Sequence, residues 1–362
     1  MLRPNVTALT LLALAGLAAC GSETTNVAPD ATPTPDAAPD ATPTPDADPP
    51  ADATPAPDAD PPADVAPAPD ADPPADVPEP PPDTSPCDMV TAGTVSGFMV
   101  DGMARSFIVT LPTGATGAGG RWPLVFAWHG FGDNAASFNA LLSRDVNNAA
   151  MPFILVTPSS TMLGPTTMPV GIDWDELRYT VPNREARLFD AIVRCVDARW
   201  GIDRDRVYTA GFSAGAIMSD LLGVVRGDQL AAVASFSGGY FSNPANPATL
   251  GVFRSFVSWP ALTTRNRYPQ LVVYGGTSDM FSLVVAAAHF DQFAANDIPY
   301  LRAAGHDVVE CGHGGGHTVP TAMRSQVIPF FAAHPRGQAT SPWRTALPAG
   351  MPSYCTFRAA GM

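Results

Sequence analysis

The chain has 362 residues and a formal net charge of −14, and 40 of its residues are proline. Residues 23–86 hold fifteen acidic and no basic side chains. When this segment and Arg3 are left out, the rest of the chain has 19 acidic and 19 basic residues. The acidic balance therefore belongs to one segment, and no basic patch is indicated that would support nucleic-acid binding.

The first 20 residues have the order of features of a bacterial export signal. Arg3 gives a positive start, residues 8–19 form an apolar stretch too short to span a bilayer, and a small-residue cleavage site follows. The peptide LAAC at residues 17–20 resembles a lipoprotein signal, in which the cysteine is lipidated. This favours a lipid anchor at Cys20 and a place at the outer membrane or cell surface. The alternative is an ordinary secretory peptide that leaves the protein secreted.

Residues 21–86 are expected to form a linker rich in Pro, Ala, Asp and Thr. One block of sequence occurs at 55–65 and again at 67–77. This composition cannot bury a core, and its prolines favour an extended, disordered stalk. A role as a proline-rich ligand is the less favoured alternative.

Residues 87–362 are long enough for one large catalytic domain. Apolar runs alternate with helical patterns, which predicts an α/β fold with a mostly parallel central sheet flanked by helices. Strands are predicted at 106–111, 124–128, 153–156, 207–210, 232–236, 271–274 and 307–310, and helices at 184–200, after residue 213 and near 321–333. In such sheets, functional residues gather at the carboxyl ends of the strands.

Four cysteines remain beyond Cys20, namely Cys87, Cys195, Cys311 and Cys355. An even number outside the cytoplasm indicates disulfides, and three connectivities are possible. Because Cys87 and Cys355 lie near the two ends of the domain, we expect these two to pair. No cysteine has metal-ligand spacing to another, and the sequence predicts neither a metal nor a cofactor.

A G-x-S-x-G motif centred on Ser213 follows the predicted strand 207–210 and precedes a helical pattern. A strand-to-helix turn of this kind holds a serine hydroxyl clear of the backbone, and the glycines allow close approach of the neighbouring chain. A serine hydroxyl is a weak nucleophile and needs a base beside it. Ser213 is therefore the candidate nucleophile.

His317 is the preferred candidate base, in the loop after the last predicted strand. The peptide HGGGHTVP at 313–320 places it just before the closing helix, and three glycines would let the loop fold back toward Ser213. His313 is the alternative in the same loop. A zinc site made by this pair is excluded, because an i, i+4 pair needs a helix and each glycine would cost about 1 kcal/mol in one. The other histidines are assigned to a turn (His129), a polar loop (His306) and helical patterns (His289 and His334).

Asp279 is the candidate acid, because it is the carboxylate just past the predicted strand 271–274. Its alternative role is an Asx-turn or a helix cap. Nucleophile, acid and base then follow one another in the order of the α/β-hydrolase arrangement. The peptide HGFG at 129–132 ends a strand at the same edge of the sheet, so the amides of Phe131 and Ala214 are the expected oxyanion hole. A simple β-turn is the alternative for that tetrapeptide.

With these residues in place, the chain resembles the secreted α/β-hydrolase esterase family of poly(3-hydroxybutyrate) depolymerases and feruloyl or acetylxylan esterases. The matching stretches, within residues 95–335, are 123–130, 203–208, 211–215, 276–279 and 314–320. The resemblance assigns the nucleophile to Ser213, the acid to Asp279 and the base to His317. Family members often have glycine where this chain has Ala216, and tryptophan where it has Val319. Val319 is close enough to the site to bear on the choice of substrate.

Two long connections without clear periodicity, 159–183 and 240–269, are expected to shape substrate specificity. They hold four aromatic residues that would either line an acyl pocket or pack beneath the loops, namely Trp174, Phe253, Phe256 and Trp259.

The sequence thus predicts a lipid-anchored serine esterase that cleaves carboxylic esters through an acyl-enzyme, with a polyhydroxyalkanoate or a feruloyl or acetyl ester as substrate. A serine peptidase of the same fold is less favoured, because no propeller-like second domain is present. A non-catalytic surface binding protein on this scaffold would predict a broken triad. The acyl group and the oligomeric state are not fixed by the sequence.

Overall fold

The computed structural model describes residues 87–114, 120–162, 172–178, 183–283, 286–338 and 340–361. The predicted signal peptide with Cys20 and the predicted linker 21–86 lie outside these residues. Within the described ranges, no helix is both long enough and apolar enough to cross a membrane.

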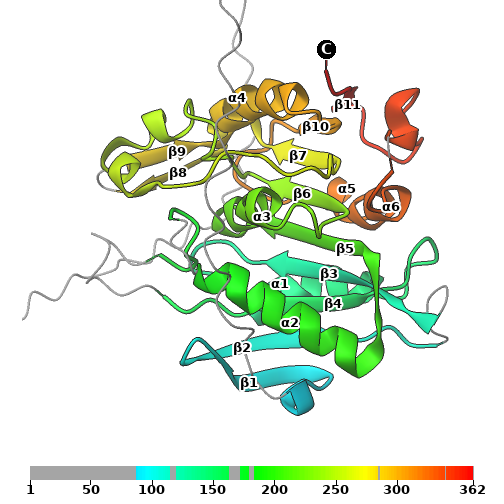
Figure 1. The fold of residues 1–362 in the computed structure, drawn as a ribbon. Coiled ribbons are helices and arrows are strands. Elements are labelled where there is room, and N and C mark those ends of the chain that lie inside the picture. The colour runs from blue at the N-terminus through cyan, green and yellow to red at the C-terminus, as the bar shows by residue number, and fades with distance from the viewer. Residues whose placement is uncertain are drawn as a thin grey trace, which may run out of the picture. The chain divides into compact units, whose positions relative to one another are not determined.

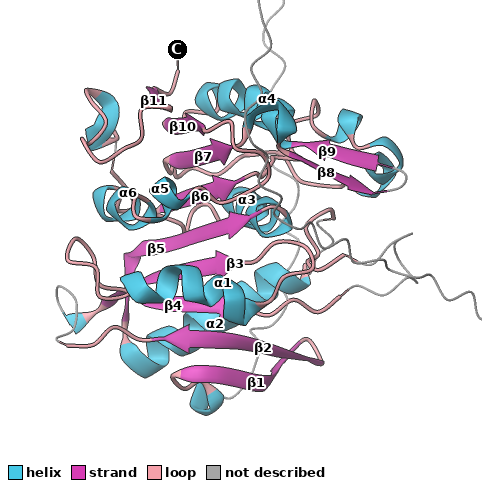
Figure 2. Cartoon of the chain, turned by 180° about the vertical axis from the view of Figure 1, so that it is seen from behind, coloured by secondary structure: helices cyan, strands magenta, loops and turns pink. Residues whose placement is uncertain are grey.

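The central sheet has nine strands in the order β1-β2-β4-β3-β5-β6-β7-β10-β11 (Figures 1 and 2). Neighbours from β4 to β10 are parallel, whereas β1, β2 and β11 pair antiparallel at the edges. The strands are β1 (Gly93–Val100), β2 (Met103–Thr110), β3 (Trp122–Trp128), β4 (Ile154–Pro158), β5 (Ile202–Phe212), β6 (Ala232–Phe236), β7 (Gln270–Tyr274), β10 (Val308–Gly312) and β11 (Cys355–Arg358). The predicted mostly parallel sheet is confirmed, and each predicted strand overlaps an observed one.

Helices cover both faces of the sheet. In β3, Leu124 and Phe126 join the core on the face of α2 and α3, and the alternate residues Val125 and Ala127 join the core on the face of α1 and α6. This alternation is the two-residue period of a strand buried on both sides. The helices are α1 (Ala135–Leu142), α2 (Arg184–Trp200), α3 (Ala214–Val225), α4 (Phe290–Ala303), α5 (Thr321–Arg324) and α6 (Val327–Ala333).

Helix α2 has the predicted bounds, and local chemistry explains them. The side chain of Asn183 accepts hydrogen bonds from the backbone N–H groups of Glu185 and Ala186, which would otherwise be unpaired at the helix start. At the other end, Gly201 has φ of 70°, a conformation that glycine adopts without strain. The predicted closing helix near 321–333 is divided into α5 and α6.

A second, two-stranded sheet lies outside the central one. It is a hairpin of β8 (Met280–Leu283) and β9 (Ala286–His289), placed between β7 and α4. The assignment of His289 to a helical pattern is therefore wrong, because this residue ends β9 and pairs with Met280. Pairing with a neighbouring strand overrides the helix propensity of the alanines, since strand formation depends mainly on context.

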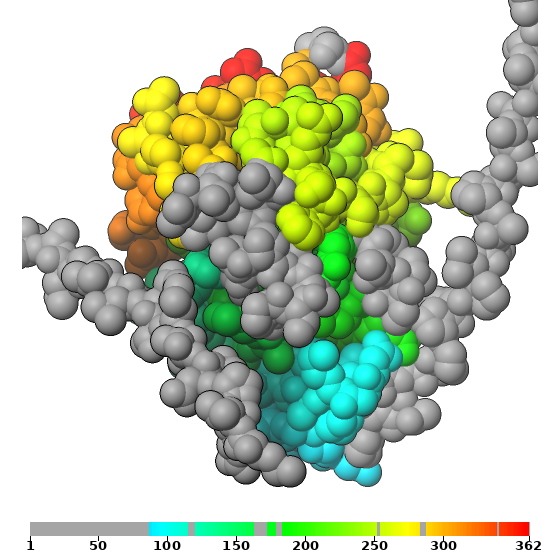
Figure 3. Space-filling view, turned by 90° about the vertical axis from the view of Figure 1, so that its left-hand side faces the viewer, coloured from blue at the N-terminus to red at the C-terminus, as the bar shows by residue number. Residues whose placement is uncertain are grey.

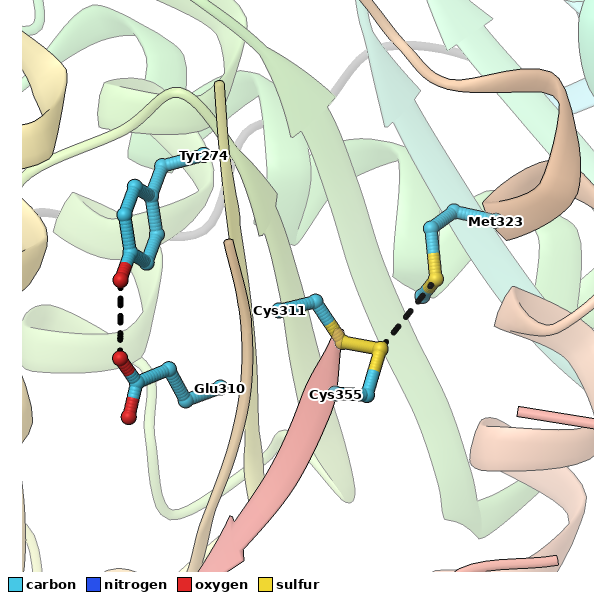
Figure 4. Close-up of a disulfide and its surroundings, with 5 residues drawn as sticks. All are labelled: Tyr274, Glu310, Cys311, Met323 and Cys355. Atoms are coloured by element: carbon cyan, nitrogen blue, oxygen red, sulfur yellow. Dashed lines mark hydrogen bonds between the residues drawn. A yellow bond between two sulfur atoms is a disulfide. The ribbon is translucent and has the colours of Figure 1, made fainter. Parts of the chain in front are cut away.

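Two disulfides link Cys87 to Cys195 and Cys311 to Cys355. The expected pairing of Cys87 with Cys355 is wrong. Cys87 lies in a short 3-10 helix (Cys87–Met89) that packs beside α2, which carries Cys195. Cys311 and Cys355 are direct partners across β10 and β11, and Figure 4 shows their bond beside Met323. The register between β10 and β11 places Cys311 opposite Cys355. The positions of the cysteines relative to the ends of the domain do not predict this pairing.

Candidate active site

Ser213 occupies a strained turn between β5 and α3. Its φ of 57° and ψ of −123° are unusual for a residue with a side chain. A Cβ atom on Gly211 would lie 2.1 Å from the carbonyl oxygen of Gly215, and one on Gly215 would lie 2.1 Å from that of Trp128. Both positions of the motif therefore require glycine, and the turn presents the serine at the carboxyl end of the sheet.

His317 lies in the loop after β10 and faces Ser213. Its Nε2 atom is 3.0 Å from Oγ of Ser213. The imidazole contacts two aromatic rings: it stacks on Phe290 with centroids 4.8 Å apart and an angle of 11°, and its centroid lies 4.7 Å from that of Phe212. These two contacts restrict the orientation of the ring.

Asp279 follows β7 and lies behind the imidazole. Its Oδ1 atom is 2.7 Å from Nδ1 of His317, and its side chain is fully buried. The second oxygen, Oδ2, accepts hydrogen bonds from the Ser237 hydroxyl at 2.8 Å and from the Gly275 N–H at 2.7 Å. Because a carboxylate only accepts, Nδ1 of His317 is the donor in this hydrogen bond, and in a neutral imidazole Nε2 is then the acceptor that faces the serine.

The structure therefore brings together the three side chains that the sequence singled out, from the ends of β5, β7 and β10. The sequence did not single out Ser237, which follows β6, or Phe290, which begins α4. A signal for Ser237 existed, because the run SGG follows the predicted strand 232–236 at the edge where the other site residues gather.

The loop 129–133 passes beside the nucleophile. A Cβ atom on Gly130 would lie 3.4 Å from Cβ of Ser213, and the Gly132 N–H donates to Asp173 at 2.9 Å, which holds the loop. Among the hydrogen bonds of the described residues, none uses the amide of Phe131 or of Ala214. Both residues line the same pocket as Ser213.

The other histidines have structural partners. His313 accepts a hydrogen bond from the Gly315 N–H at 3.1 Å and stays outside the cluster. His129 is buried against Trp174, with ring centroids 4.7 Å apart. Burial lowers the pKa of both His306 and His334 to about 4. In the described part of the chain, no three His, Cys, Asp or Glu side chains are grouped as metal ligands.

An apolar pocket opens beside Ser213, on the side of α3 and the β8–β9 hairpin. Its lining consists of aromatic and aliphatic side chains with one carboxyl group: Phe131, Ile172, Glu176, Leu177, Ser213, Ala214, Ile217, Phe241, Leu250, Phe281, Ala287, Ala288 and Phe290. Figure 3 views the molecule from the side of the β8–β9 hairpin. The yellow-green to yellow atoms, which follow β6 and precede α4 in the sequence, lie in its upper part, and the cyan atoms of β1 and β2 lie at the bottom. The pocket is suited to the acyl part of an ester.

The aromatic residues that the sequence proposed for this pocket pack around it instead. Trp174 is buried and donates its indole N–H to the carbonyl of His129 at 3.0 Å. Trp259 donates its indole N–H to the carbonyl of Glu176 at 2.6 Å. Phe256 packs against the apolar cluster that includes Ile217 and Phe241. The side chain of Phe253 lies outside the part of the chain that the structure describes. The packing alternative therefore holds for Trp174, Phe256 and Trp259.

The order of the strands and the elbow at Ser213 define the α/β-hydrolase fold. Solved structures agree with this. A pOPH variant in complex with pNPB has a TM-score of 0.60 at 17% identity over 76% of this chain and 96% of that one. Native sOPH has a TM-score of 0.58 at 18% identity, over 75% and 94%.

The chain belongs to the family described as Esterase PHB depolymerase, whose model matches residues 105–306. It is also 24% identical over 308 residues to the oxidized polyvinyl alcohol hydrolase of Sphingopyxis sp. (strain 113P3), a match that covers 71% of this chain and 83% of the relative. The predicted family is confirmed, and the protein is a carboxylic ester hydrolase.

Proposed function

We propose that this protein is a serine esterase that works outside the cytoplasm, with Ser213 as nucleophile, His317 as general base and Asp279 as the acid that orients the base. The observation that best supports this is one continuous line of hydrogen bonds, 3.0 Å from Oγ to Nε2 and 2.7 Å from Nδ1 to Oδ1. Both distances are within reach for proton transfer.

In the first half of the reaction, Nε2 of His317 takes the proton of Ser213 as Oγ bonds to the ester carbonyl carbon. The carbonyl oxygen becomes an oxyanion, which the amides of Phe131 and Ala214 stabilise. Loss of one such donor typically costs about 3 kcal/mol in the barrier. The imidazolium then protonates the leaving alkoxide, the ester C–O bond breaks, and an acyl-enzyme remains on Ser213.

In the second half, His317 takes a proton from water, and the hydroxide attacks the acyl carbon. The second tetrahedral intermediate collapses when Oγ leaves and recovers its proton from the imidazolium. The products are a carboxylic acid and the free enzyme. Asp279 stabilises the positive imidazole in both halves, and the Ser237 and Gly275 hydrogen bonds keep its carboxylate in position.

The substrate is an ester of a polymer or its oligomers. The family description names a depolymerase, and the relative's name also refers to a polymer, which favours a polyhydroxyalkanoate-like ester. A feruloyl ester is the alternative. The lipid anchor at Cys20 and the stalk 21–86 would hold the catalytic domain, residues 87–362, away from the membrane surface, within reach of a polymer outside the cell.

The test compares hydrolysis of p-nitrophenyl acetate, p-nitrophenyl butyrate, a feruloyl ester and a peptide anilide by the protein and by Ser213→Ala. We expect ester turnover that falls at least about 10⁴-fold in the variant. The control is Ser96→Ala, a serine in edge strand β1, which should keep full activity. Ester turnover no faster than that of Ser213→Ala would favour a binding protein, and selective anilide cleavage would favour a peptidase.

A further inference from the structure

The apolar pocket beside Ser213 contains one carboxyl group, on Glu176. This residue is 5% exposed, and its Oε2 atom is buried without a hydrogen-bond partner among the described residues. Buried polar atoms are nearly always paired in folded proteins, so an unpaired one in a pocket indicates a missing partner. The other lining side chains are aliphatic or aromatic, except for Ser213, whose hydroxyl already pairs with Nε2 of His317 at 3.0 Å.

The surrounding charges favour the neutral form of this carboxyl. Burial raises the pKa of Glu176 well above its ordinary value, and the nearby carboxylates of Asp175, Glu185 and Asp173 raise it further. A neutral carboxyl group both donates through its O–H and accepts through its carbonyl oxygen. It can therefore pair with an uncharged oxygen of a ligand, without bringing a charge into the pocket.

Hydrogen bonds hold the backbone of Glu176 and its neighbour in place, which fixes the position from which the carboxyl group extends. The Trp259 indole donates to the carbonyl of Glu176 at 2.6 Å. The Ser258 N–H donates to the carbonyl of Leu177 at 3.1 Å, and Leu177 lines the same pocket. The neighbouring carboxyl of Asp175 is also buried with an unpaired oxygen, but Asp175 is not among the residues that line the pocket.

We propose that Glu176 forms a polar subsite in the acyl pocket that selects acyl chains bearing a hydroxyl or keto oxygen over unsubstituted alkyl chains. The inference rests on the proposed esterase function, since it assigns the pocket to the acyl group. An alkyl chain fills the apolar pocket but leaves Oε2 unpaired, whereas an oxygen carried by the acyl chain completes its hydrogen bonding; 3-hydroxy and 4-oxo chains are the probes that test two positions. Discrimination of this kind is strong because the buried polar group of the protein is otherwise unsatisfied.

The test measures kcat/KM for two matched pairs of p-nitrophenyl esters: 3-hydroxybutyrate against butyrate, and 4-oxopentanoate against pentanoate. We expect the protein to prefer the oxygenated member of at least one pair by about tenfold. Glu176→Leu should abolish that preference, mainly by slowing the oxygenated ester and accelerating the alkyl ester. Glu176→Gln keeps an N–H donor in nearly the same shape and should retain a smaller preference in the same direction.

Asp175→Asn is the matched control, because it alters the adjacent buried carboxyl outside the pocket. For this variant, the ratio of kcat/KM for the oxygenated ester to kcat/KM for the alkyl ester should stay within about twofold of the ratio for the unaltered protein. The inference is overturned if neither pair is discriminated, or if Glu176→Leu and Glu176→Gln leave the ratio unchanged while all four esters are cleaved. If no ester is cleaved faster than by Ser213→Ala, the esterase function itself fails and the inference with it.

Discussion

The Ser237 hydroxyl lies 2.8 Å from Oδ2 of Asp279, on the side of the carboxylate away from His317. Ser237 is itself held in a positive-φ conformation at 54°, directly after β6. The fold thus holds this side chain in a costly conformation that directs a hydroxyl at the carboxylate behind the imidazole. In the proposed mechanism Ser237 contacts Asp279 and none of the reacting atoms, so it would act as a positioning residue.

Ser237→Ala should lower kcat for p-nitrophenyl butyrate about tenfold and leave KM nearly unchanged. The reason is that Asp279 keeps its Gly275 bond but loses the hydroxyl that fixes its second oxygen. Ser235→Ala is the matched control, since Ser235 is a buried serine that donates to another carboxylate, that of Asp220, at 2.8 Å. Equal losses of kcat in both variants would contradict a positioning role.

The disulfide Cys311–Cys355 should contribute strongly to stability. It closes a loop with a sequence separation of 44, and the chain-entropy estimate for such a loop is about 4 kcal/mol in the free energy of unfolding. Replacing both cysteines by alanine is expected to lower that free energy by this order, measured by urea unfolding. The bond also ties β11 to β10, the strand that leads to His317. A loss below 1 kcal/mol would show that strand pairing alone holds the edge.

His334 should make stability depend on pH. Burial lowers its pKa to about 4 from 6.5, and its ring is held by the carbonyl of Phe330 and the hydroxyl of Ser341. Between pH 6.5 and 4 the unfolded chain takes up a proton that the folded protein does not, so the free energy of unfolding falls as the pH falls. The loss attributable to this residue is about 3 kcal/mol across the window. Urea unfolding of His334→Gln should show a shallower pH slope; an unchanged slope would contradict this.

The proposed lipidation of Cys20 can be tested by expressing the full chain in a bacterial host. If it is lipidated, the protein should incorporate labelled palmitate and partition with membranes. Cys20→Ser should do neither, because a chain without acyl groups lacks the hydrophobic anchor. An unlabelled protein in the medium in both cases would indicate an ordinary secretory signal, and label retained in the serine variant would show that the lipid is not attached at Cys20.

The parts of the site that could be predicted from the sequence are those with a local signal. The two glycines around Ser213 form a motif that is readable from five consecutive residues, and Asp279 and His317 follow the ends of apolar strands. In a parallel sheet such ends converge, so order along the chain is enough to place them together.

The parts that could not be predicted depend on contacts between distant segments. Ser237 meets Asp279 across 42 positions, and the SGG run after the predicted strand 232–236 places Ser237 at the right edge without indicating its partner. The two disulfide pairs follow from strand register and from the packing of the first 3-10 helix on α2. Likewise, Phe241 of one long connection and Phe281 of the β8–β9 hairpin line the pocket, whereas Trp259, from the same connection as Phe241, does not line it and bonds to the backbone of Glu176.

Ile217 offers a test of which wall limits the acyl chain. It lies one helical turn after Ser213 on α3 and lines the pocket, at 7% exposure. Ile217→Trp should fill the space for longer acyl chains. The kcat/KM for p-nitrophenyl butyrate should then fall at least about tenfold relative to that for p-nitrophenyl acetate, because a lost methylene contact is worth about 1 kcal/mol or more. Ile217→Val, which removes a single methylene, should preserve the order of preference. If Ile217→Trp slows both esters equally, the acyl group lies elsewhere and the pocket serves the leaving alcohol.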